Sequence, residues 1–109
     1  MKLPRCAEAY ASLRKVTAYL LATDHPVGGP KARYFVSRGY ILEDPRRFED
    51  AVKDLACSGT VTKTESSRWG TKYVVEGELS APDGRPMRLC TVWMIKGDQA
   101  PQLITAYPT

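Results

Sequence analysis

The chain has 109 residues with a formal net charge of +4, and 43% of its residues are hydrophobic. This length corresponds to one domain that can bury its own core without help from disulfides or a metal. No apolar run approaches the roughly 20 residues of a membrane span, and no apolar stretch follows the charged N-terminus as in a signal peptide. We therefore expect a single cytoplasmic domain over residues 1–109 that does not enter a membrane.

The first half of the chain shows helical periodicity. Residues 6–11 form a short mixed segment that we interpret as an extended edge. Ser12 is placed to cap a helix over 13–22, and the Gly28-Gly29 pair then predicts a loop. Pro30 suits the first turn of a second helix that runs to about Arg38. The apolar residues of that second helix are Ala32, Phe35 and Val36.

The third helix has the clearest pattern. Asp44 is its predicted cap, Pro45 stands at its first position, and Ser58-Gly59 ends it. Its buried stripe is predicted from the helical spacing of Phe48, Ala51, Val52, Leu55 and Ala56.

From residue 60 the periodicity changes to that of strands. The segments 60–66, 71–79, 87–96 and 102–107 read as strands, with a turn at residues 82–84. Both faces of the third segment are apolar, which indicates a central strand. Helices followed by a strand meander predict an α+β fold, with two to three N-terminal helices packed on a four-stranded antiparallel sheet.

Positive charge is concentrated near the N-terminus. Residues 1–40 hold seven Lys/Arg against two acids (+5), residues 41–60 three against five (−2), and residues 61–109 six against five (+1). This balance favours an anionic partner, although it lacks the dense clusters of dedicated DNA binders. A solvated basic face is the alternative interpretation.

The three cysteines are odd in number and widely spaced. No Cys-x-x-Cys pair exists and His25 is the only histidine, so the sequence predicts neither a structural zinc site nor any other metal or cofactor. We expect Cys57 and Cys90 to be small core residues, and unpaired cysteines favour a reducing cytoplasm.

Four phrases carry a family resemblance: HPVGGPKARYF (25–35), GTKYVVEGELSAPDGR (70–85), RLCTVWMI (88–95) and PQLITAYP (101–108). Together they resemble a bacterial domain-of-unknown-function family, over Leu3–Pro108. That family is similar in plan to the barnase–EndoU–colicin–RelE group of ribonucleases and toxins. The resemblance implies a metal-free active site on the open sheet face and, for many members, an antitoxin or immunity protein as partner.

Metal-free RNA cleavage needs an acid, a base and cations for the phosphorane charge. His25 is the candidate acid or base because its ordinary pKa lies near neutrality. Lys31 and Arg88 would stabilise phosphate charge, and Thr105 and Tyr107 would donate hydroxyl hydrogen bonds. Further phosphate contacts are predicted at the glycine loop and nearby basic residues: Gly28, Gly29, Arg33 and Lys72.

Each of these residues also has a structural interpretation. His25 before a proline can simply bond a backbone carbonyl, and Tyr107 and Trp93 can be core aromatics with polar tips. Thr91 alternates with Leu89 and Trp93, so its hydroxyl can be satisfied inside the sheet.

Two functional hypotheses follow from the sequence. The first is a ribonuclease-like protein of toxin type that acts on RNA without metal, or a relative that retains the RNA-binding surface. The second is a non-enzymatic interaction module that pairs with an acidic antitoxin or immunity partner.

Overall fold

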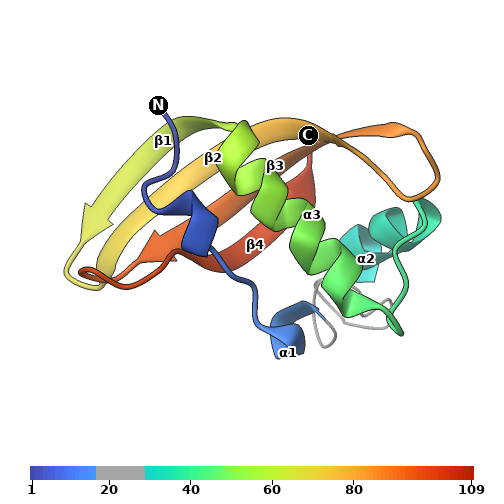
Figure 1. Cartoon of the computed structure of the whole chain (residues 1–109), viewed down its shortest axis with the longest axis horizontal. Coiled ribbons are helices and arrows are strands. Elements are labelled where there is room, and N and C mark those ends of the chain that lie inside the picture. The colour runs from blue at the N-terminus through green and yellow to red at the C-terminus, as the bar shows by residue number, and fades with distance from the viewer. Residues whose placement is uncertain (17–28) are drawn as a thin grey trace.

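The structure is a computed structural model that describes residues 1–16 and 29–109. Its elements are η1 (Cys6–Glu8), α1 (Leu13–Lys15), α2 (Gly29–Ser37), α3 (Pro45–Ser58), β1 (Thr60–Ser67), β2 (Gly70–Ser80), β3 (Pro86–Ile95) and β4 (Gln102–Pro108) (Figure 1). The four strands form one antiparallel sheet in the order β1-β2-β3-β4. The α+β prediction is confirmed, as are all four strands to within about two residues.

The helices agree less well with the sequence prediction. Among the described residues only α2 and α3 exceed a single turn, which is the lower end of the two to three helices that were expected before residue 60. The Ser12 cap is present, because its hydroxyl accepts a hydrogen bond from the Lys15 amide at 3.1 Å. The rest of the predicted helix over 13–22 lies largely outside the described residues. Residues 6–11 are also not simply extended, since they begin with the 3-10 turn η1.

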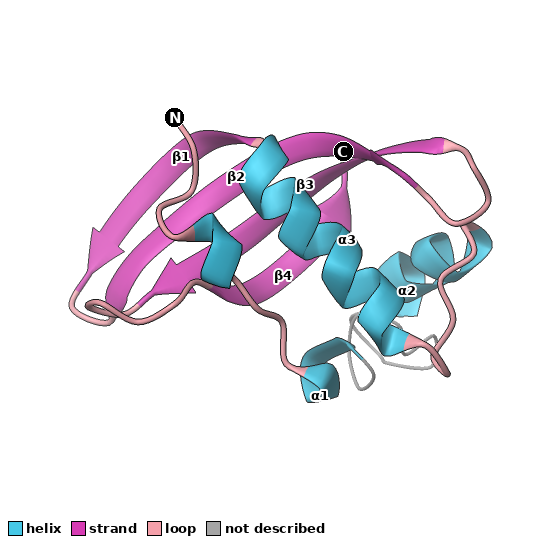
Figure 2. Ribbon diagram, viewed as in Figure 1, coloured by secondary structure: helices cyan, strands magenta, loops and turns pink. Residues whose placement is uncertain are grey.

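Helix α3 lies across one face of the sheet (Figure 2). Phe48, Val52, Leu55 and Ala56 of α3 are buried, as the periodicity predicted, whereas Ala51 of the predicted stripe is only half-buried. They share one core with the inward-facing strand residues Val75, Leu89, Trp93, Leu103 and Ala106. Burial of these side chains is the main favourable free energy for folding.

Helix α2 packs beside α3. The Phe35 ring meets the Phe48 ring edge-on, with the centroids 4.9 Å apart, and Ala32 is buried as expected. Val36 was predicted to be buried but is 38% exposed. The buried stripe of α2 is therefore narrower than the sequence indicated, because it includes Ala32 and Phe35 but not Val36.

A buried hydrogen-bond chain lies under α3. The Thr91 hydroxyl donates to the Val75 carbonyl at 2.8 Å and accepts from the Trp93 indole N–H at 2.8 Å. Trp93 is completely buried. The structural interpretation of both residues is therefore confirmed, and neither belongs to an exposed site.

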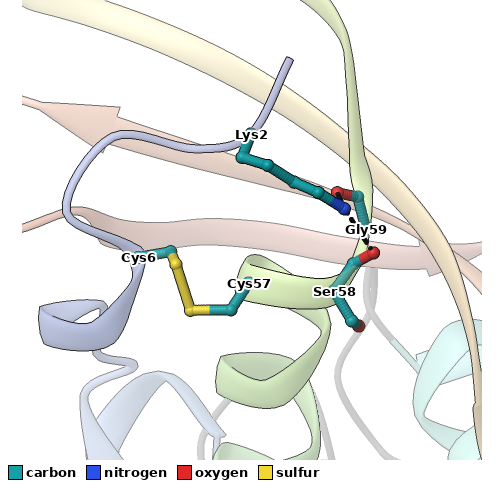
Figure 3. Close-up of a disulfide and its surroundings, with 5 residues drawn as sticks. All are labelled: Lys2, Cys6, Cys57, Ser58 and Gly59. Carbon is teal, nitrogen blue, oxygen red and sulfur yellow. Dashed lines mark hydrogen bonds between the residues drawn. A yellow bond between two sulfur atoms is a disulfide. The ribbon is translucent and has the colours of Figure 1, made fainter.

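The N-terminal segment is fastened to the end of α3 and to both sheet edges. A disulfide joins Cys6 to Cys57, and the Lys2 ammonium donates to the Ser58 and Gly59 carbonyls at 2.9 and 3.0 Å (Figure 3). The Val61 amide on β1 donates to the Met1 carbonyl, and Tyr10 forms a parallel bridge to the start of β4.

The disulfide corrects the sequence prediction for Cys57. That residue is half-buried and bonded rather than a free core side chain, while Cys90 is free and buried as predicted. The argument for a reducing compartment rested on unpaired cysteines, so it no longer has support. No helix in the described part of the chain is long and apolar enough to cross a membrane.

Candidate functional site

The face of the sheet opposite α3, here called the open face, is not crossed by any described helix (Figure 2). Strand side chains alternate between faces, so the registers show which residues share this one. The open face carries four of the sequence-predicted site residues: Lys72 on β2, Arg88 on β3, and Thr105 and Tyr107 on β4. It also carries Glu76, Glu78, Cys90, Val92 and Met94.

One row across three strands forms the centre of this face. Cys90 on β3 pairs with Glu76 on β2 and with Tyr107 on β4. Tyr107 is 39% exposed, so the alternative reading of this residue as a core aromatic is wrong. The row therefore presents a carboxylate, a buried thiol and an accessible phenol.

The neighbours of Tyr107 raise the pKa of its hydroxyl group. The hydrogen bond between its hydroxyl and the Cys90 sulfur is the main cause that raises the pKa of Tyr107 above its usual value. The electrostatic interaction with Cys90, partial burial, and the charge of Glu76 raise this pKa further. Tyr107 is therefore a hydrogen-bond donor at neutral pH and not a base.

Arg88 and Thr105 flank the row. Arg88 is exposed and pairs with Glu78, two residues along β3 from Cys90. Because Cys90 pairs with Tyr107, Arg88 is the diagonal cross-strand neighbour of Tyr107, and residues in that relation are about 7–8 Å apart. Thr105 is half-buried, pairs with Val92, and stands two residues from Tyr107 on the same strand. The sheet thus gathers Arg88, Thr105 and Tyr107 around Cys90.

Lys72 does not join this group. It pairs with Glu65 and Met94, whereas Arg88 pairs with Glu78. Lys72 and Glu78 are six residues apart on β2, a separation of about 20 Å along the strand. Lys72 belongs instead to a concavity at the other end of the open face, beside Trp69.

The predicted loop site is only partly described. His25 and Gly28 lie outside the described residues. The second helix begins at Gly29, one residue before the predicted start at Pro30, and includes Lys31, whose side chain is not described. Arg33 on the same helix is exposed. Phosphate binding at this helix start stays a prediction.

Sequence reasoning missed Glu76, Cys90 and Trp69 as site residues. Glu76 is four residues from Lys72 on β2, so alternation puts both on one face, but only the β2–β3 and β3–β4 registers set Glu76 beside Cys90 and Tyr107. Within residues 1–16 and 29–109, no cluster of three or more His, Cys, Asp or Glu side chains is arranged to hold a metal ion.

Comparison with known proteins assigns a family. Residues 2–109 match the model of the family described as Domain of unknown function (DUF6883). The chain belongs to this family. No curated protein sequence matches the chain.

The fold is similar to that of a solved structure. A chain in the contact-dependent growth inhibition toxin–immunity protein complex from Klebsiella pneumoniae 342 aligns with a TM-score of 0.66 and 17% identity, over 91% of this chain and 98% of that one. At this identity the similarity establishes a common fold and nothing more.

Proposed function

We propose that this protein is a ribonuclease-like domain of toxin type that cleaves RNA at the open face of its sheet. The observation that carries the proposal is that Arg88 and Thr105 flank the row formed by Glu76, Cys90 and Tyr107. Its fold, which is also that of a chain in a toxin–immunity complex, supports the toxin type. The net charge of +4 suits an anionic substrate.

The chemistry follows from the side chains of the row. Glu76 accepts the proton of the ribose 2′-hydroxyl, whose oxygen then attacks the adjacent phosphorus. Arg88 and the Tyr107 hydroxyl stabilise the negative charge that develops on the phosphorane oxygens. The 5′-oxygen leaves with a proton from a general acid, the role that we assign to His25, and the other product carries a 2′,3′-cyclic phosphate. Lys31 adds positive charge, and no metal takes part.

The test is cleavage of a fluorescently labelled single-stranded RNA in the presence of a chelator. Replacing Glu76 with Gln or His25 with Ala removes an acid–base group, so we expect a rate loss of about 10²- to 10⁴-fold. Arg46→Ala is the matched control for Arg88→Ala, because Arg46 is an exposed arginine on α3, across the opposite face of the sheet.

The ribonuclease proposal is contradicted if the wild type neither cleaves RNA nor arrests growth when it is expressed. It is also contradicted by a wild-type activity that Glu76→Gln and Arg88→Ala both leave unchanged. Far-ultraviolet circular dichroism of each variant confirms that the fold is retained before rates are compared.

A second candidate function is partner binding without catalysis. Strand β1 is an edge strand and is exposed over almost its whole length, with Lys63 and Glu65 on it. Beyond Val61, whose amide donates to the Met1 carbonyl, an exposed edge of this kind accepts a strand from another chain. An acidic partner would suit the basic charge of the protein. This function would be favoured by a protein that co-purifies through β1 and whose binding does not depend on the proposed active-site residues.

A further inference from the structure

The tip of the β1–β2 hairpin exposes a large aromatic surface. Ser67 pairs with Gly70, so Arg68 and Trp69 form a two-residue turn. The Trp69 side chain is 65% exposed, and the Arg68 guanidinium lies 4.7 Å from the centroid of its ring. An exposed aromatic ring of this size offers a flat face on which a planar ligand can stack.

The backbone holds this tip in one conformation. The Ser67 hydroxyl accepts a hydrogen bond from the Trp69 amide and donates one to the Gly70 carbonyl, both at 3.2 Å. Gly70 has a φ of +137°, and a Cβ at this position would collide with the Ile95 carbonyl and come within 3.1 Å of the Met94 sulfur. The backbone of the tip therefore lies tightly against the end of β3.

Trp69 forms one wall of a concavity of about 400 Å³ at the end of the open face. Its other walls are an apolar floor, two lysines and polar groups: Met94, Ile104, Lys72, Lys96, Glu65, Ser67 and Gln102. Lys63 lies 4.0 Å from the Glu65 carboxylate. The four nearby cations, Lys63, Arg68, Lys72 and Lys96, outnumber that carboxylate, which leaves a charge of +3.

We propose that this concavity is a nucleobase subsite for a single-stranded RNA segment. One base stacks on the face of the Trp69 indole away from Arg68, while Lys72 and Lys96 contact the flanking phosphates. A flat aromatic surface ringed by cations is the arrangement with which proteins hold unpaired bases. An acidic polypeptide would use the cations but would gain little from the ring.

The inference rests on the proposed function for its choice of RNA, and it extends that function along the sheet. The Lys72–Met94 row and the Glu76–Cys90 row are four residues apart on one face. That separation is about 13 Å along the strands. A single-stranded RNA that stacks one base on Trp69 and continues along the open face therefore reaches the Glu76–Tyr107 row.

The protein offers an internal reporter for the test. Trp69 and Trp93 are its two tryptophans, and Trp93 is completely buried. We expect a short 2′-O-methyl RNA, which cannot be cleaved through its 2′-oxygen, to quench the emission of the wild type. It should leave the emission of Trp69→Phe, in which Trp93 alone remains, unchanged.

Affinity is measured separately by anisotropy of the same labelled oligonucleotide. Stacking of one base contributes about 1–3 kcal/mol, so Trp69→Ala should weaken binding about 5- to 150-fold, while Trp69→Phe keeps most of the affinity. Lys96→Ala should weaken binding and reduce its salt dependence. Ile41→Ala and Arg46→Ala, at exposed positions outside the concavity, are the matched apolar and charge controls.

The outcomes separate this inference from the proposed function. Quenching by the oligonucleotide without RNA cleavage keeps the subsite and removes the ribonuclease. If the wild type cleaves RNA and Trp69→Ala changes neither the affinity nor the positions of cleavage, the subsite is overturned and the ribonuclease is kept. Quenching by polyglutamate but not by RNA also overturns the subsite, and assigns the concavity to an acidic protein.

Discussion

Removing the Cys6–Cys57 disulfide should destabilise the protein without disturbing its open face. The two cysteines are 51 residues apart in sequence, so the bridge closes a long loop in the unfolded chain. The loop-closure model gives about 4 kcal/mol for a loop of this size, and this figure is an upper value because strain and residual structure reduce it. Since a domain of this size has only about 5–15 kcal/mol of stability, the loss should be large.

Urea unfolding of the oxidised wild type and of the double variant Cys6→Ser, Cys57→Ser measures this loss directly. Adding a thiol reductant should move the wild-type midpoint to that of the double variant and leave the double variant unchanged. A thiol titration of the unfolded, oxidised wild type should find one free thiol, that of Cys90. Three titrating thiols, or a double variant as stable as the oxidised wild type, would refute the reasoning.

Three further predictions follow from buried contacts and from the central row. Thr91→Val leaves the buried Trp93 N–H without its acceptor and should cost about 1–3 kcal/mol in urea unfolding, while Thr91→Ser restores the bond. Gly59→Ala places a Cβ 2.8 Å from the Glu76 and Leu55 carbonyl oxygens and should lower stability by about 1–3 kcal/mol; an unchanged midpoint would contradict this close approach. Cys90→Ala should lower the pKa of Tyr107 toward 10.0, as measured by phenolate absorbance against a Tyr107→Phe blank. In the wild type the folded state holds this proton more tightly than the unfolded chain. The contribution of Tyr107 to stability is therefore complete below pH 10 and is lost as the pH rises through the folded pKa. A Tyr107 pKa that does not respond to Cys90→Ala would show that the thiol is not its neighbour.

Local patterns in the sequence determined helix α3 and the four strands. Helical spacing between Phe48 and Ala56 gave the buried stripe of α3, and alternation gave the four strands and the central place of β3. These signals are local, because each follows from the 3.6- or two-residue period of one element.

Only the tertiary structure decided which of these residues meet. Strand registers put Glu76 and Cys90 beside Tyr107 and set Lys72 about 20 Å from Arg88, although both lie on one face. The Cys6–Cys57 bridge joins residues 51 positions apart, and no local period records such a contact. Distances across a sheet depend on how separate segments pair, so a period within one segment fixes the direction of a side chain but not its neighbours.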